Sequence, residues 1–155
     1  RIGIKKALPE SYECWANKAK MESWFLEKAD YYWGDKHRTP DELIQKGDSF
    51  AWKWSHWHFT EKGQILDANG KDMIYFTFGS GGVVRVKLND TGNGTEVVLK
   101  QDEIPTDENS KMELFVGCST GWTFWLTNLK AYLEYGITLH ATGLQQDETT
   151  DLVNS

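Results

Sequence analysis

The stretch GWTFWLTNLKAYLEYG, residues 121–136, decides the fold class of this chain of 155 residues. Large apolar residues recur every three or four positions along it and just before it, which is the spacing of one face of an α-helix. Pro105 disfavours helix upstream, and Gly136 suits the left-handed turn that ends many helices. We therefore predict one long helix over residues 108–135. Its apolar stripe consists of Phe115, Cys118, Trp122, Trp125, Leu126, Leu129 and Leu133.

The residues before this helix follow a period of two, which is typical of strands. Apolar and polar residues alternate in several runs between residues 48 and 103, and the phase changes near His56, which predicts a bulge there. Short runs of turn-forming residues separate the strands, so neighbouring strands should run antiparallel. The predicted turns lie at residues 61–63, 69–70, 79–82 and 90–94.

The start of the chain predicts one strand and then helix. Residues 2–7 alternate weakly, and Tyr12, Trp15, Ala16 and Ala19 share one helix face. Two short helices, the second over residues 21–26, and one bent helix both remain open at this stage.

Two polar segments frame the remaining organisation. Residues 31–33 predict a short strand, whereas residues 34–46 are polar and fit no pattern. Residues 140–155 are rich in Asp, Glu, Gln and Thr and predict a flexible tail. We therefore expect one domain over residues 1–139.

Composition bounds the function classes. The net charge of -6 and the lack of any Lys/Arg run argue against nucleic-acid binding, and an aromatic share of 14% argues against disorder. No stretch approaches the ~20 apolar residues of a membrane span. Cys14 and Cys118 favour two buried thiols and a cytoplasmic location, with a disulfide as the alternative. The start at Arg1 leaves open whether residues precede it.

Several short motifs occur in a suggestive order. They are Leu8-Pro9-Glu10, Cys14-Trp15, Trp24-Phe25, Gly47-Asp48-Ser49-Phe50, Gly63-Gln64-Ile65-Leu66, Gly94-Thr95-Glu96-Val97, and Gly121-Trp122 with Leu126, Leu129-Lys130 and Leu133-Glu134. Together, over residues 2–136, they resemble the helix-grip fold of the START-like and birch-pollen-allergen-like (SRPBCC) superfamily. The resemblance is to the branch named after activators of the 90-kilodalton heat-shock-protein ATPase. Cys14 departs from it, because the family often has Val there, and residues 34–46 lie outside its motifs.

The resemblance implies an α+β fold in which a curved antiparallel sheet wraps around a long C-terminal helix, with two short helices after the first strand. It also implies an apolar cavity between helix and sheet that binds a hydrophobic or aromatic small molecule, including lipids. A core completely filled by bulky rings is the alternative. The residues expected to line the cavity are Trp52, Trp54, Ile74, Phe76, Phe78, Val84, Val86, Phe115, Trp122, Trp125 and Leu129.

Two other functions stay open. The family name alone implies a chaperone partner and a role in stress response, and some superfamily members are cyclases or lyases. His56 and His58 stand at i, i+2 on a strand, a spacing that can chelate a metal, but no third ligand joins them at convincing spacing. We therefore expect no metal, no cofactor and no catalytic residue.

Overall fold

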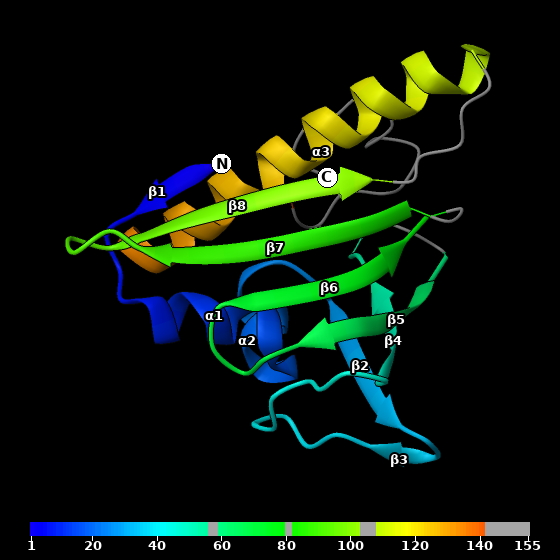
Figure 1. Cartoon of the computed structure of the whole chain (residues 1–155), viewed down its shortest axis with the longest axis horizontal. Coiled ribbons are helices and arrows are strands. Elements are labelled where there is room, and N and C mark those ends of the chain that lie inside the picture. The colour runs from blue at the N-terminus through cyan, green and yellow to red at the C-terminus, as the bar shows by residue number, and fades with distance from the viewer. Residues whose placement is uncertain (56–58, 80–81, 103–107, 142–155) are drawn as a thin grey trace.

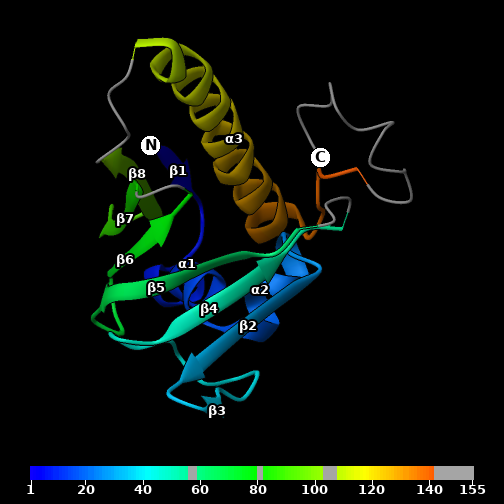
Figure 2. The same ribbon diagram turned by 90° about the vertical axis from the view of Figure 1, so that its right-hand side faces the viewer.

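The structure, a computed structural model, describes residues 1–55, 59–79, 82–102 and 108–141, and of residues 103–119 it describes no side chain. A curved sheet forms one layer, and the helices lie against one of its faces (Figures 1 and 2). The elements are β1 (Ile2–Ile4), α1 (Leu8–Ala16), α2 (Lys18–Trp24), β2 (Lys28–Trp33), β3 (Lys36–His37), β4 (Ser49–Lys53), β5 (Glu61–Ala68), β6 (Met73–Phe78), β7 (Gly82–Asp90), β8 (Thr95–Asp102) and α3 (Glu108–Tyr135).

The described strands form one eight-stranded sheet in the order β1-β8-β7-β6-β5-β4-β2-β3, and each neighbouring pair is antiparallel. Strands adjacent in sequence are mostly adjacent in the sheet, as short turns require. There are two exceptions: β1 pairs with β8 at one edge of the sheet, with Ile2 opposite Val97, and β3 lies outside β2 at the other edge, so that β2 pairs with β4. The predicted α+β class with an antiparallel sheet and a long C-terminal helix is confirmed. The bulge predicted near His56 lies outside the described residues.

The long helix begins and ends where the sequence indicates. Gly136 has φ +69°, and its N–H donates to Tyr132 O at 2.9 Å, so it ends α3 as predicted. The last turns of α3 are fastened to the N-terminal segment: Lys130 Nζ donates to Gly3 O at 2.6 Å, and Glu134 Oε1 accepts the Lys5 N–H at 2.7 Å. The C-terminal half of the helix therefore holds the edge strand β1 in place.

Two short helices, rather than one bent helix, follow β1. Asn17 has extended backbone (φ -140°, ψ 150°), which ends α1, and its side chain accepts the Lys20 N–H at 2.8 Å, which caps α2. The break restarts the helical phase, and Ala19, expected on the buried face, is consequently exposed.

The polar segment 34–46 packs against this helix pair. Asp48, which is fully buried, accepts from Arg38 Nε at 2.7 Å and Nη2 at 2.9 Å in a two-pronged ion pair. Ile44 is also buried, and its N–H donates to Ala16 O at 2.8 Å. The segment is thus ordered by one charge pair and one apolar anchor, neither of which produces a period in the sequence.

Residues 61–63 start β5 and do not form a turn, so that prediction is wrong. Gly63 lies opposite Phe50 in the sheet, and a Cβ placed on it would stand 2.4 Å from Phe50 Cζ and 2.5 Å from Thr77 Oγ1. Glycine serves here to admit a neighbouring ring, which is a common reason for glycine inside a strand.

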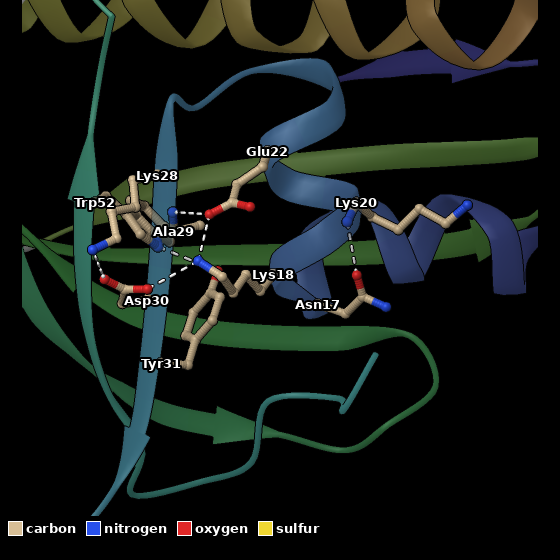
Figure 3. A network of polar contacts seen from close by, with 9 residues as sticks. All are labelled: Asn17, Lys18, Lys20, Glu22, Lys28, Ala29, Asp30, Tyr31 and Trp52. Carbon is tan, nitrogen blue, oxygen red and sulfur yellow. Dashed lines mark hydrogen bonds and ion pairs between the residues drawn. The ribbon is translucent and has the colours of Figure 1, made fainter. Parts of the chain in front are cut away.

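A polar network joins α2 to β2 (Figure 3). Lys18 Nζ lies 2.5 Å from Glu22 Oε1 and 2.9 Å from Asp30 Oδ1, and Lys28 Nζ lies 2.9 Å from Asp30 Oδ2. Glu22 Oε1 also accepts the Ala29 N–H at 2.9 Å. These contacts fix the start of β2 against the helix that carries Trp24.

The network predicts a pH dependence of stability. Burial acts to raise the pKa of Asp30, but hydrogen bonds and charge from Lys18 and Lys28 outweigh it, and the pKa is lowered. The ionised carboxylate therefore stabilises the folded state above the unfolded-state pKa of about 4, and this contribution is lost as pH falls through the lower folded-state value. Asp30→Asn should flatten the fall in unfolding free energy below about pH 4.

Urea titrations at several pH values between pH 2.5 and 7 would measure this effect. The matched control is Asp35→Asn, which removes an exposed carboxylate in the turn between β2 and β3. Equal acid sensitivity of wild type and Asp30→Asn would contradict the assignment.

The packing around Gly63 predicts a second effect. Gly63→Ala should lower the unfolding free energy by ~1–3 kcal/mol, because the new methyl group overlaps the buried Phe50 ring. Gly121→Ala is the control: no described atom lies within 4 Å of a Cβ there, and alanine in a helix should stabilise by ~0.5–1 kcal/mol. Chemical denaturation of both variants checks the pair, and a neutral Gly63→Ala would refute the overlap.

Candidate functional site

Aromatic rings from both layers meet between α3 and the sheet. We call this group the aromatic cluster. On the helix side its rings come from α1, from α2 and from Phe25, which follows α2. On the sheet side they come from β4, from Trp54, which follows β4, and from β6, and the remaining rings come from α3. Its members are Trp15, Trp24, Phe25, Trp52, Trp54, Phe76, Phe78, Trp122, Phe124 and Trp125.

Trp125 is the centre of the aromatic cluster. Its ring centroid lies 5.9 Å from those of Trp52 and Trp54, on the sheet side. On the helix side it lies 4.0 Å from Phe25 and 6.0 Å from Trp15. The separations from Trp15, Trp52 and Trp54 lie in the range of favourable aromatic pairs, which add ~0.5–1.5 kcal/mol each beyond burial, and Phe25 packs closer still.

The aromatic cluster changes from buried to half-buried along its length. Trp24 and Trp52 are 0% and 1% exposed, whereas Trp54, Phe78 and Phe124 keep part of their surface open. Trp54 follows β4, Phe78 ends β6, and Phe124 lies on α3, so the half-buried rings come from three different elements.

Three indole N–H groups of the aromatic cluster donate hydrogen bonds to other residues of the chain. Trp122 Nε1 donates to Gln101 Oε1 at 2.6 Å, Trp24 Nε1 to Cys14 O at 2.8 Å, and Trp52 Nε1 to the Tyr31 hydroxyl at 3.2 Å. Burial raises the pKa of that Tyr31 hydroxyl, so it stays neutral.

Trp15 differs from these three indoles, because its N–H is buried without a partner among the described residues. The Trp15 side chain is 2% exposed. Leaving a buried donor without a partner lowers stability by ~1–3 kcal/mol. The Trp15 N–H is therefore a donor that a bound acceptor would satisfy.

The structure places ten of the eleven predicted lining residues in the same core. Trp52, Ile74, Phe76, Val84 and Val86 are buried on the sheet, with Trp54 and Phe78 at its margin. Trp122, Trp125 and Leu129 are buried on α3. The side chain of Phe115 lies outside the description. That these residues enclose a ligand remains a prediction.

Sequence reasoning did not assign Trp15, Trp24 and Phe25 to this site, although their apolar helical spacing marks them as buried. It also missed Asn128, which is fully buried. The Asn128 amide donates to Trp24 O at 2.6 Å and accepts the Leu139 N–H at 2.6 Å. Its position three residues after Trp125, inside the apolar stripe, was the available signal.

Other candidate chemistry gains no support in the described parts of the chain. Cys14 is a free buried thiol, and burial raises its pKa to about 12, which keeps it protonated and a poor nucleophile. The described residues contain no group of three or more metal-ligating side chains, and His56 and His58 lie outside them. No helix in the described ranges is long and apolar enough to cross a membrane.

A sheet that grips one long helix across an aromatic core defines a START-like domain. The chain belongs to the family described as Activator of Hsp90 ATPase homolog 1-like proteins, whose model matches residues 9–134. This confirms the resemblance inferred from the sequence motifs. A search of curated proteins finds no match.

Solved structures share the fold at low sequence identity. A protein from Staphylococcus saprophyticus has a TM-score of 0.73 at 18% identity, with 91% of this chain and 93% of that chain covered. The Aha1 dimer from Colwellia psychrerythraea gives 0.64 at 15% identity, covering 87% and 93%. An AHSA1-like protein from Rhizobium etli gives 0.58 at 14% identity, covering 93% and 91%.

The aromatic cluster predicts the effect of removing a central ring. Trp122 is 8% exposed and contacts Phe78 and Trp125, with ring centroids 4.9 and 5.0 Å away. Trp122→Ala should lower the unfolding free energy by ~3–5 kcal/mol, through lost burial and the cavity that remains. Trp33→Ala, at a ring that is 63% exposed, should change it by less than about 0.5 kcal/mol. Denaturant unfolding measures the change in unfolding free energy for the two variants. Equally small changes in both would show that the Trp122 ring contributes little to stability.

Proposed function

We propose that residues 1–139 form a START-like binding domain for a flat hydrophobic or aromatic small molecule, which binds at the aromatic cluster. One observation carries the proposal: the rings form a continuous series from fully buried Trp24 and Trp52 to half-buried Trp54, Phe78 and Phe124. The three half-buried rings give an apolar ligand a surface on which to pack, next to the fully buried rings.

The chemistry of the aromatic cluster favours an apolar ligand. An incoming ring would contact the faces and edges of several aromatic side chains and would release weakly held water. Burial of the ligand's apolar surface would supply most of the affinity, and a small number of polar contacts would supply specificity. The free and buried thiol of Cys14 favours a cytoplasmic location for this activity.

The unpaired Trp15 N–H supports a ligand that carries one hydrogen-bond acceptor. A carbonyl or ether oxygen beside Nε1 would satisfy a donor that has no partner among the described residues. The class of ligand is therefore a flat apolar compound with a single acceptor at one end.

Titration with a panel of such compounds, followed by intrinsic tryptophan emission, tests the proposal. We expect saturable quenching at micromolar concentration, about -8 kcal/mol of binding free energy. Trp52→Ala should abolish the response, because it removes a ring that contacts Trp125 and Phe76, whereas Trp33→Phe, far out on an exposed strand end, should preserve it. A folded wild-type protein that responds to no apolar class would refute the proposal.

A matched pair of ligands tests the acceptor. 2-Acetylnaphthalene should bind wild type about five- to tenfold tighter than 2-ethylnaphthalene, the value of one hydrogen bond to a buried donor. In Trp15→Phe the two compounds should bind equally, because a phenyl ring still fills part of the space while the indole N–H is gone. Equal binding in wild type would exclude the acceptor and leave the apolar site intact.

A chaperone-associated role is the second candidate. The family description and the name of the Colwellia protein, Aha1, favour it. Adding the purified protein to an Hsp90 ATPase assay would test the idea, and an unchanged hydrolysis rate at saturating protein would contradict it.

A further inference from the structure

A cleft of about 620 Å³ opens at the end of β6 opposite to the aromatic cluster. It is lined by α1, by the β5–β6 loop, by the end of β7 and by Leu43. Asp72 of the cleft precedes β6, whereas Phe78 of the aromatic cluster ends it, and six strand residues span roughly 20 Å. The cleft is therefore separate from the site of the proposed function, and its size lies in the range of ligand-binding clefts.

The floor of the cleft is apolar. Leu8 of α1 and Leu43 are half-buried and pack against the core, and Leu88 of β7 is 3% exposed. These three side chains come from distant parts of the sequence and offer a surface that an apolar side chain can cover.

The rim of the cleft is acidic. Glu13, Asp72 and Asp90 line it, against a single basic residue, Lys71. None of the three carboxylates forms an ion pair within the described ranges: Asp72 accepts from the Asn69 amide, and Asp90 accepts the Gly92 N–H. The local excess of negative charge is thus available to a cation from outside.

Tyr12 adds a buried donor to this cleft. Its side chain is 2% exposed, and its hydroxyl accepts the Gly70 N–H at 2.9 Å. Within the described residues the Tyr12 hydroxyl takes part in this one hydrogen bond, as the acceptor, and Tyr12 lines the cleft, so its proton can be donated to a bound molecule. Burial, with smaller effects of the Asp72 and Asp67 charges, raises the pKa of this phenol against the lowering effect of the Gly70 N–H, so the donor proton is retained.

We propose that this cleft binds a short basic and apolar peptide segment of a partner protein. Its Lys or Arg side chains pair with Glu13 and Asp90, its apolar side chains cover the leucine floor, and a peptide carbonyl accepts the Tyr12 hydroxyl proton. A peptide is the chemistry that supplies all three features along one chain, since a simple organic cation offers no acceptor for Tyr12.

Fluorescence anisotropy with a labelled acetyl-Leu-Lys-Leu-Arg-Leu-amide peptide tests the proposal. We expect saturable binding that weakens as salt rises, because exposed charge pairs are screened. Peptides with Glu in place of both basic residues, or Ser in place of the leucines, should bind at least about fivefold more weakly. Amide shifts of Gly70 and Lys71 should accompany binding.

The charge contribution is isolated by two double variants. Glu13→Gln with Asp90→Asn should raise the Kd about fivefold or more, while Glu27→Gln with Asp35→Asn removes the same charge far from the cleft and should leave it within about twofold. If both double variants lost the same peptide affinity, the net charge of the protein would explain the loss, and the proposed site would be wrong. The proposal would also be wrong if the three peptides bound equally or if binding did not saturate. It would likewise be wrong if the indole N–H of Trp125 shifted while the amides of Gly70 and Lys71 did not.

Discussion

Trp125 is the contact on which the arrangement of layers depends. One indole touches rings of α1, of the segment after α2, of the end of β4 and of β6. A helix of 28 residues packed on a twisted sheet can slide or rotate unless a bulky side chain fixes its position. Because protein interiors are close-packed, shifting α3 along the sheet would break these ring contacts and force others to overlap, so the contacts of Trp125 constrain both the position and the rotation of α3.

Asn128 reinforces the same constraint by polar means. It lies one turn beyond Trp125 and joins α3 to Trp24 O and to Leu139 N. A buried amide is stable only when its donor and acceptor are both satisfied, so these bonds define one geometry rather than a range. Apolar packing supplies most of the stabilisation, and the amide supplies uniqueness.

Periodicity predicted most of the fold. The helix at 108–135 has strong local boundaries, and the strands from Phe50 to Leu99 alternate clearly, so local signals and tertiary structure agree. The failures arise where a distant side chain decides. Gly63 looks like a turn residue until Phe50 is seen against it, and residues 34–46 are held by the Arg38–Asp48 pair, which has no periodic signature. The rings on the sheet and α3 were predictable as one group, whereas those of α1 and α2 joined it only through tertiary packing.

The pairing of β1 with β8 has a consequence for how the chain reaches this structure. Ile2 pairs with Val97, and Lys130 donates to Gly3 O, so the first strand has no partner until most of the polypeptide exists. Contacts of such large sequence separation raise the contact order and slow folding, because a long loop must close before they form. During synthesis the hairpins from β4 to β8 can assemble first, and the N-terminal strand then docks onto a nearly finished sheet.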